Sequence, residues 1–213
     1  MQVPKALKED WELVGGLSSP SKMPCFGFST PAEKCKTGRK LRKVKNSVCS
    51  KCYAMKGFYV FTGPKKALKI RYDNIYKEGW VPAMTNLIKY LSSNEYFRWF
   101  DSGDVDSLIQ LENIVQIAKN LPNIKFWLPT REYSFVSEYL AIHGKFPDNL
   151  TVRLSTLMIN GTPMKALAKR LGLTTSRVSD TNPTCPAPSQ NNKCLSCRAC
   201  WDKNVETVTY KKH

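Results

Sequence analysis

Residues 96–132, YFRWFDSGDVDSLIQLENIVQIAKNLPNIKFWLPTRE, contain two short apolar runs separated by a helical pattern. The runs at 96–100 and 124–128 have the length and the aromatic and branched residues of buried strands. Between them, apolar residues recur at helical spacing from 108 to 118. A strand, a crossover helix and a second strand predict two parallel neighbours in one sheet.

The same alternation continues on both sides of this stretch. Helical spacing predicts one helix opened by Pro64 and another over 81–91, and after residue 132 it predicts helices near 135–140 and over 164–171. Alternating residues over 150–154 predict a further strand. About half to two-thirds of an eight-unit barrel is present, so we predict an α/β fold that forms a partial, incomplete parallel β/α barrel.

We expect a single domain over residues 1–213 with three parts. A cysteine-rich and basic N-terminal loop occupies 22–57, an α/β core occupies 62–180, and a cysteine-rich C-terminal segment or loop occupies 181–213. Most of seven aromatic residues are assigned to the core by their spacing, with base stacking as the alternative. These residues are Phe58, Tyr59, Phe61, Trp80, Trp99, Trp127 and Trp201.

Composition narrows the class of protein. With 42% apolar and 23% charged residues and no apolar run of about 18 residues, the chain is neither disordered nor membrane-spanning, and no membrane partner is expected. Charged residues near Lys8 interrupt any export signal, so we expect a cytoplasmic protein. The net charge of +16 and the basic run between Cys35 and Cys49 favour nucleic acid, or a host protein, as partner.

Polar residues follow each expected strand, at the sheet edge where ligands of parallel α/β proteins bind. These candidate cofactor contacts are Ser102, Gly103, Asp104, Arg131 and Ser155. The structural alternative is that Asp104 or Asp106 caps the helix after the first strand and that Ser134 caps the next helix.

The eight cysteines form two sequence groups of four. The C-terminal group is Cys185, Cys194, Cys197 and Cys200, and the N-terminal group is Cys25, Cys35, Cys49 and Cys52. In a reducing compartment such thiols are more often metal ligands than disulfides. The C-x2-C-x2-C run favours an iron–sulfur cluster, whereas the looser N-terminal spacing suits zinc and iron equally. We predict one or two clusters of the 4Fe-4S type, with zinc as the alternative and Cys25 as either a ligand or a buried bystander.

Six motifs carry a family resemblance: KMPCFGFSTPAEKC (22–35), SVCSKCYAMKG (47–57), FRWFDSGD (97–104), FWLPTREY (126–133), CPAPSQ (185–190) and CLSCRACW (194–201). Over about residues 22–201 the chain resembles the gene-product-88 family of phages and mobile elements, which implies a protein of the host cytoplasm.

More distantly, the chain is similar to radical S-adenosylmethionine (SAM) enzymes, which are partial-barrel iron–sulfur proteins. That resemblance implies that Cys35, Cys49 and Cys52 hold a cluster with one open iron. It further implies that Gly103 and Asp104 approach the SAM amine, and that Arg131 or Ser155 contacts its carboxylate or ribose.

Three functions follow as hypotheses. The first is a radical SAM-like enzyme that acts on or near nucleic acid. The second is a non-catalytic iron–sulfur or zinc protein that binds nucleic acid or a host protein. The third is a redox carrier or sensor.

Overall fold

The computed structural model describes residues 3–92 and 95–212 and contains a six-stranded sheet. All five strand pairs are parallel, and the strands lie side by side in chain order. The strands are β1 (Gly27–Phe28), β2 (Tyr96–Trp99), β3 (Lys125–Thr130), β4 (Leu150–Ser155), β5 (Thr174–Ser179) and β6 (Thr207–Lys211). This arrangement confirms the α/β class and is compatible with a partial barrel.

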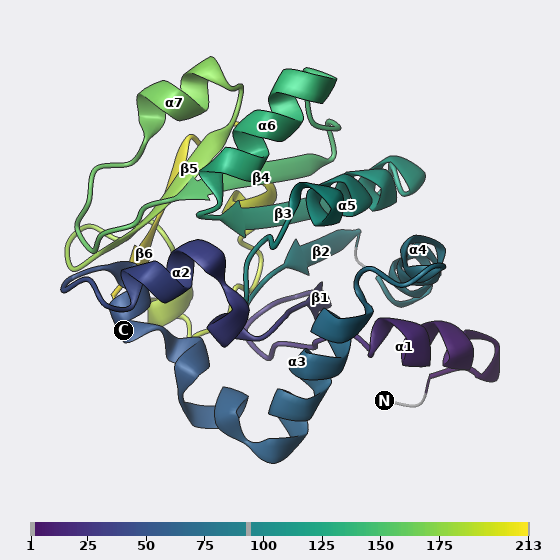
Figure 1. The fold of residues 1–213 in the computed structure, drawn as a ribbon. Helices are drawn as coiled ribbons and strands as arrows, with labels where there is room; N and C mark the ends of the chain where they lie inside the picture. Colours follow the sequence, from purple (N-terminus) through teal and green to yellow (C-terminus); the bar gives the residue numbers. More distant parts are fainter. Residues whose placement is uncertain (1–2, 93–94, 213) are drawn as a thin grey trace.

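Helices and short 3-10 turns connect the strands (Figure 1). The α-helices are α1 (Lys8–Val14), α2 (Lys36–Leu41), α3 (Thr62–Asn74), α4 (Trp80–Leu91), α5 (Leu108–Asn120), α6 (Tyr133–His143) and α7 (Lys165–Arg170). The 3-10 turns are η1 (Lys5–Leu7), η2 (Ala32–Lys34), η3 (Val48–Lys51), η4 (Tyr53–Met55), η5 (Gly57–Val60), η6 (Ala187–Ser189) and η7 (Ala199–Trp201). None of the helices in the described ranges combines the length and the apolar character that a bilayer crossing requires.

The two faces of the sheet are covered differently. On one face, Phe97 and Trp99 of β2 and Phe126 of β3 join the main core, which α1, α4, α5 and α6 complete. Alternate residues of a strand point to opposite faces. The other face therefore carries Trp127 of β3, which packs with Trp201 of the C-terminal segment. A cysteine-rich segment thus takes the place of a helical layer on this face.

The sheet extends beyond the range expected for the α/β core. Strand β1 lies in the N-terminal part and β6 in the C-terminal part, so both cysteine-bearing regions contribute to the sheet. The expectation that Asp104 or Asp106 caps the next helix is wrong, because the Ser107 side chain caps α5 by accepting from the Gln110 amide. Ser134 lies inside α6, which begins without a side-chain cap.

Candidate functional site

Three N-terminal cysteines gather beyond β1. Cys35 stands at the start of α2, Cys49 lies in η3, and Cys52 follows that turn. A Cβ atom placed on Gly38 would lie 3.6 Å from the Sγ atoms of both Cys35 and Cys49. Burial raises the pKa of the Cys35 thiol, and the charges of Asp104, Cys52 and Cys49 raise it further. The three thiols therefore converge, and glycine at position 38 keeps the space beside them free.

Hydrogen bonds hold this triad at the carboxyl edge of the sheet. The buried Glu132 carboxylate, two residues past β3, accepts from the Thr37 amide at 2.7 Å and from the Thr37 hydroxyl at 2.8 Å. A carboxylate at the first turn of a helix also interacts favourably with the helix dipole. On the other side, the Val48 amide donates to the Leu157 carbonyl at 2.9 Å, just after β4. The sequence places Glu132 among the polar residues that follow a strand, but its hydrogen bonds to Thr37 depend on tertiary packing and could not be predicted.

Asp104 and Arg131 connect neighbouring strand ends. The Asp104 carboxylate accepts from the Thr130 hydroxyl at 2.6 Å, from the Val105 amide at 2.8 Å and from the Arg131 amide at 2.9 Å. Burial raises the pKa of Asp104 to about 6, although these hydrogen bonds favour the ionised form. The Arg131 guanidinium donates to the Thr156 carbonyl at 3.0 Å, so the network reaches from β2 to β4.

The other predicted rim residues also join strand ends. The Ser102 hydroxyl donates to the Thr30 carbonyl at 2.9 Å. Gly103 has φ +86°, and a Cβ atom there would lie only 2.0 Å from Thr30 Oγ1. Ser155 and Ser176 share a hydroxyl hydrogen bond of 3.0 Å. Glycine at position 103 is therefore needed for the close approach of the β1 and β2 ends.

Several polar atoms at this edge are buried without a hydrogen-bond partner among the described residues. They are Ser29 Oγ after β1, Asp101 Oδ1 after β2 and Thr156 Oγ1 after β4. An unpaired buried polar group costs about 1–3 kcal/mol, so such atoms commonly bind water or a ligand. The carboxyl edge therefore offers polar groups that a ligand could satisfy. Sequence reasoning did not single out Ser29.

The four C-terminal cysteines line one cavity on the opposite face of the sheet from the helices. The lining is formed by Cys185, Pro186, Ala187, Cys194, Cys197, Ala199, Cys200, Trp201 and Val208. The cavity has a volume of about 20 Å³. These four cysteines therefore line one small cavity.

Cys25 lies with this second group. It is buried with Trp127 and Trp201, and Cys200 packs against the same cluster. Burial raises the pKa of the Cys25 thiol to about 12, and the nearby Cys194 and Cys200 also act to raise it. The structure therefore divides the eight cysteines into three and five, whereas the sequence groups contained four each.

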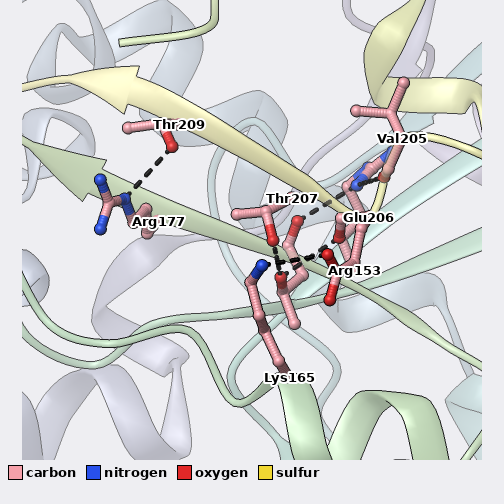
Figure 2. Close-up of polar contacts among 8 residues, drawn as sticks. Arg153, Lys165, Arg177, Val205, Glu206, Thr207 and Thr209 are labelled. Atoms are coloured by element: carbon pink, nitrogen blue, oxygen red, sulfur yellow. Dashed lines mark hydrogen bonds and ion pairs between the residues drawn. The ribbon is translucent and has the colours of Figure 1, made fainter. Parts of the chain in front are cut away.

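Arg153 attaches the C-terminal segment to β4. Its side chain is fully buried and donates to five backbone carbonyls, those of Ala199, Asp202, Val205, Cys200 and Thr175, at 2.7–3.1 Å. Figure 2 shows the contact with Val205. Burial lowers the pKa of Arg153, while Tyr210, Cys200 and Asp202 oppose that effect. The guanidinium is thus held by main-chain dipoles beside a cysteine.

A second cation lies on the same face. The Arg98 guanidinium stacks over the Trp127 ring at 4.5 Å, and its charge acts on Cys25 and Cys194. Two guanidinium groups thus supply positive charge beside the cavity that the thiols line, which would favour an anionic group there. Within residues 3–92 and 95–212, no three His, Cys, Asp or Glu side chains are arranged around a single metal ion.

Comparison with known proteins gives one family. The model described as gene product 88 matches residues 4–203, a range that includes both cysteine groups and β1 to β5. No curated protein and no solved structure matches the chain. The resemblance expected from the six sequence motifs is thereby confirmed, and the chain belongs to the gene product 88 family.

Proposed function

We propose that this protein binds iron–sulfur clusters. The observation that carries the proposal is the cavity lined by Cys185, Cys194, Cys197 and Cys200. Four thiolates complete the coordination of a cubane, and the C-x2-C-x2-C spacing is one that ferredoxin-type sites use. Zinc remains the alternative metal, and it would require the four sulfur atoms to close around one ion.

The proposed setting is a partial parallel barrel with a cysteine-rich loop at each end of the chain. Six parallel strands in chain order and helices on one face support this description. In such folds ligands bind at the carboxyl ends of the strands, which is where Cys35, Cys49 and Cys52 lie. Three thiolates would leave one iron of a cubane without a protein ligand.

The resemblance to radical SAM enzymes stays a prediction for this N-terminal triad. A bound cluster would supply an electron to a ligand at the strand ends. The chain's own contribution would be to bind and orient that ligand, through Ser29, Asp101 and Thr156. Asp104 and Arg131 would hold the surrounding loops in place by the hydrogen bonds described above.

Elemental analysis of anaerobically reconstituted variants tests the two sites separately. With two cubanes, the wild type should hold about eight iron atoms per chain, and Cys197→Ala and Cys52→Ala should each lose about four. Loss of a cluster ligand also removes folding free energy, so stability should fall with the iron content. Cys25→Ala is the matched control, because four other cysteines line the C-terminal cavity. Zinc without acid-labile sulfide, or unchanged iron in both variants, would contradict the proposal.

A redox carrier or sensor is the second candidate function. The presence of four cysteines around one cavity beside Trp201 favours it, because a cluster coordinated by all four would have no open position for a substrate. Incubation of the reduced holoprotein with SAM separates the two candidates. Formation of 5′-deoxyadenosine supports the enzyme, whereas no product and no SAM-induced change in the electron paramagnetic resonance spectrum support the carrier.

A further inference from the structure

A run of exposed apolar side chains follows the N-terminal cysteines. Phe58 and Phe61 are 69% and 61% exposed, and Tyr53, Met55 and Val60 are also exposed. These residues belong to η4, η5 and the residue after them, and we refer to residues 53–61 as the aromatic ridge. Soluble proteins rarely leave so many large apolar side chains together in solvent unless the surface binds something.

The ridge is fixed at its base and open at its outer side. The Tyr59 hydroxyl donates to Asp101 Oδ2 at 2.8 Å, and the Tyr53 hydroxyl donates to the Asp101 carbonyl. The Phe58 and Phe61 rings lie edge to face with their centroids 5.9 Å apart. The ridge is therefore attached to the carboxyl edge of the sheet while its two phenylalanines remain in solvent.

The surroundings of the ridge are positively charged. The chain contains no Asp or Glu from residue 34 to residue 72. Exposed cations within or beside the ridge are Lys51, Lys56, Lys65 and Lys66. Helix α3 begins directly after Phe61, and Lys65 and Lys66 lie in its first turns. In Figure 1 this region and α2 lie beside the carboxyl ends of β2 and β3.

We propose that the aromatic ridge binds single-stranded nucleic acid, with bases stacked on Phe58 and Phe61 and phosphates paired with the nearby lysines. Exposed aromatic rings within a cationic surface are the features that sequence-tolerant single-strand binding uses. Bases in a duplex are stacked on one another and do not reach such rings. Because the ridge is hydrogen-bonded to Asp101, a nucleic-acid strand bound to the ridge would pass the carboxyl edge of the sheet. This inference stands apart from the iron–sulfur proposal.

Fluorescence anisotropy of the wild-type holoprotein with a labelled oligothymidylate, and with a duplex of equal length, tests the preference for single strands. Phe58→Ala and Phe61→Ala should each weaken single-strand binding by at least about fivefold, since stacking on one aromatic ring contributes that much per base. Both side chains are exposed, so these variants should fold. Tyr90→Ala and Ile142→Ala are matched controls, because these residues are 62% and 60% exposed on α4 and α6 and should leave affinity unchanged.

Salt dependence tests the phosphate contacts independently. Replacing both Lys65 and Lys66 by alanine should reduce the slope of log K against log salt by about 1.4, or about 0.7 for each lost phosphate contact. The phenylalanine variants should keep the wild-type slope.

Equal affinity for duplex, no binding, or unchanged binding by both phenylalanine variants would overturn the proposal. Phe58-dependent binding to vesicles of anionic lipid in place of the oligonucleotide would overturn it as well. The visible spectrum of each sample keeps the two proposals distinguishable. Oligonucleotide binding by a colourless sample contradicts the cluster alone, whereas a coloured sample that does not bind contradicts the ridge alone.

Discussion

Replacing Arg153 by lysine should loosen the C-terminal cysteine segment from the sheet. The arginine donates to five backbone carbonyls, and a lysine ammonium has three donors, so at least two carbonyls lose a hydrogen bond. An unsatisfied buried carbonyl costs about 1–3 kcal/mol, which gives about 2–6 kcal/mol for two. Water can reach the exposed Asp202, so we expect a loss of about 2–4 kcal/mol in the free energy of unfolding.

Chemical denaturation followed by circular dichroism measures this loss, and limited proteolysis shows where the structure opens. Because the segment can detach while the sheet stays folded, cleavage between residues 185 and 205 should increase more than cleavage elsewhere. Arg177→Lys is the control. Figure 2 shows Arg177 on the neighbouring strand, where its guanidinium donates to the Thr209 hydroxyl at 3.2 Å. We expect the control to lose less than about 1 kcal/mol.

Equal stability of the two variants would refute the reasoning. So would proteolysis that increases first in the helices, because Arg153 would then support the sheet as a whole. The lysine variant keeps the positive charge, so a loss of stability reports on hydrogen-bond geometry.

Three further predictions concern the carboxyl edge of the sheet. Gly38→Val should lower iron content, since its Cβ atom alone would lie 2.9 Å from Cys35 Cβ and 3.6 Å from the Cys35 and Cys49 thiols; unchanged iron would contradict this. Gly103→Ala should lower the free energy of unfolding by more than about 2 kcal/mol in urea denaturation, because of its positive φ and the clash with Thr30. Asp104 has a folded-state pKa of about 6, above its unfolded value, so its contribution to stability is largest below about pH 4 and decreases by about 3 kcal/mol as pH rises through 6. Asp104→Asn should remove this pH dependence from unfolding measured between about pH 4 and 7, and parallel pH profiles for the two proteins would count against it.

The central part of the fold was predictable because its local signals agree. Strands β3 and β4 coincide closely with the ranges 124–128 and 150–154 expected from their apolar residues. Helices α4 and α5 follow the predicted helical spacing, and their buried residues form one face. Strands and amphipathic helices that pack against each other bury one face each, and this produces a regular spacing of apolar residues in the sequence.

The outer strands were not predictable from periodicity. Strand β1 has two residues, too few to show an alternation. Strands β5 and β6 are rich in threonine and serine and are held together partly by polar contacts, such as the 2.7 Å hydroxyl pair of Thr175 and Thr207. Polar strands of this kind resemble loops in a hydropathy pattern.

The cysteines of the candidate site could be named from the sequence, but the way in which they group in space could not. Position along the chain placed Cys25 with the N-terminal cysteines, whereas packing against Trp127 and Trp201 places it with the C-terminal ones. The assignment of most aromatics to the core is confirmed for Trp80, Trp99, Trp127 and Trp201, whereas Phe58 and Phe61 are exposed. The position of Cys25 and the exposure of Phe58 and Phe61 both depend on how distant segments pack together, which the local spacing of residues does not encode.

The meeting of distant segments at the C-terminal cavity has a consequence for biogenesis. The Cys194 thiol contacts Met23 Sδ at 3.8 Å across 171 positions, and the Cys194 amide donates to the Lys22 carbonyl at 2.9 Å. During translation, Lys22 and Met23 leave the ribosome long before Cys194, so these contacts can form only when nearly the whole chain has been made. The C-terminal cavity can therefore form only at a late step of maturation. Residues 35–52 contact Glu132 and the segment up to residue 159, so the other cysteines can be arranged while synthesis is still under way.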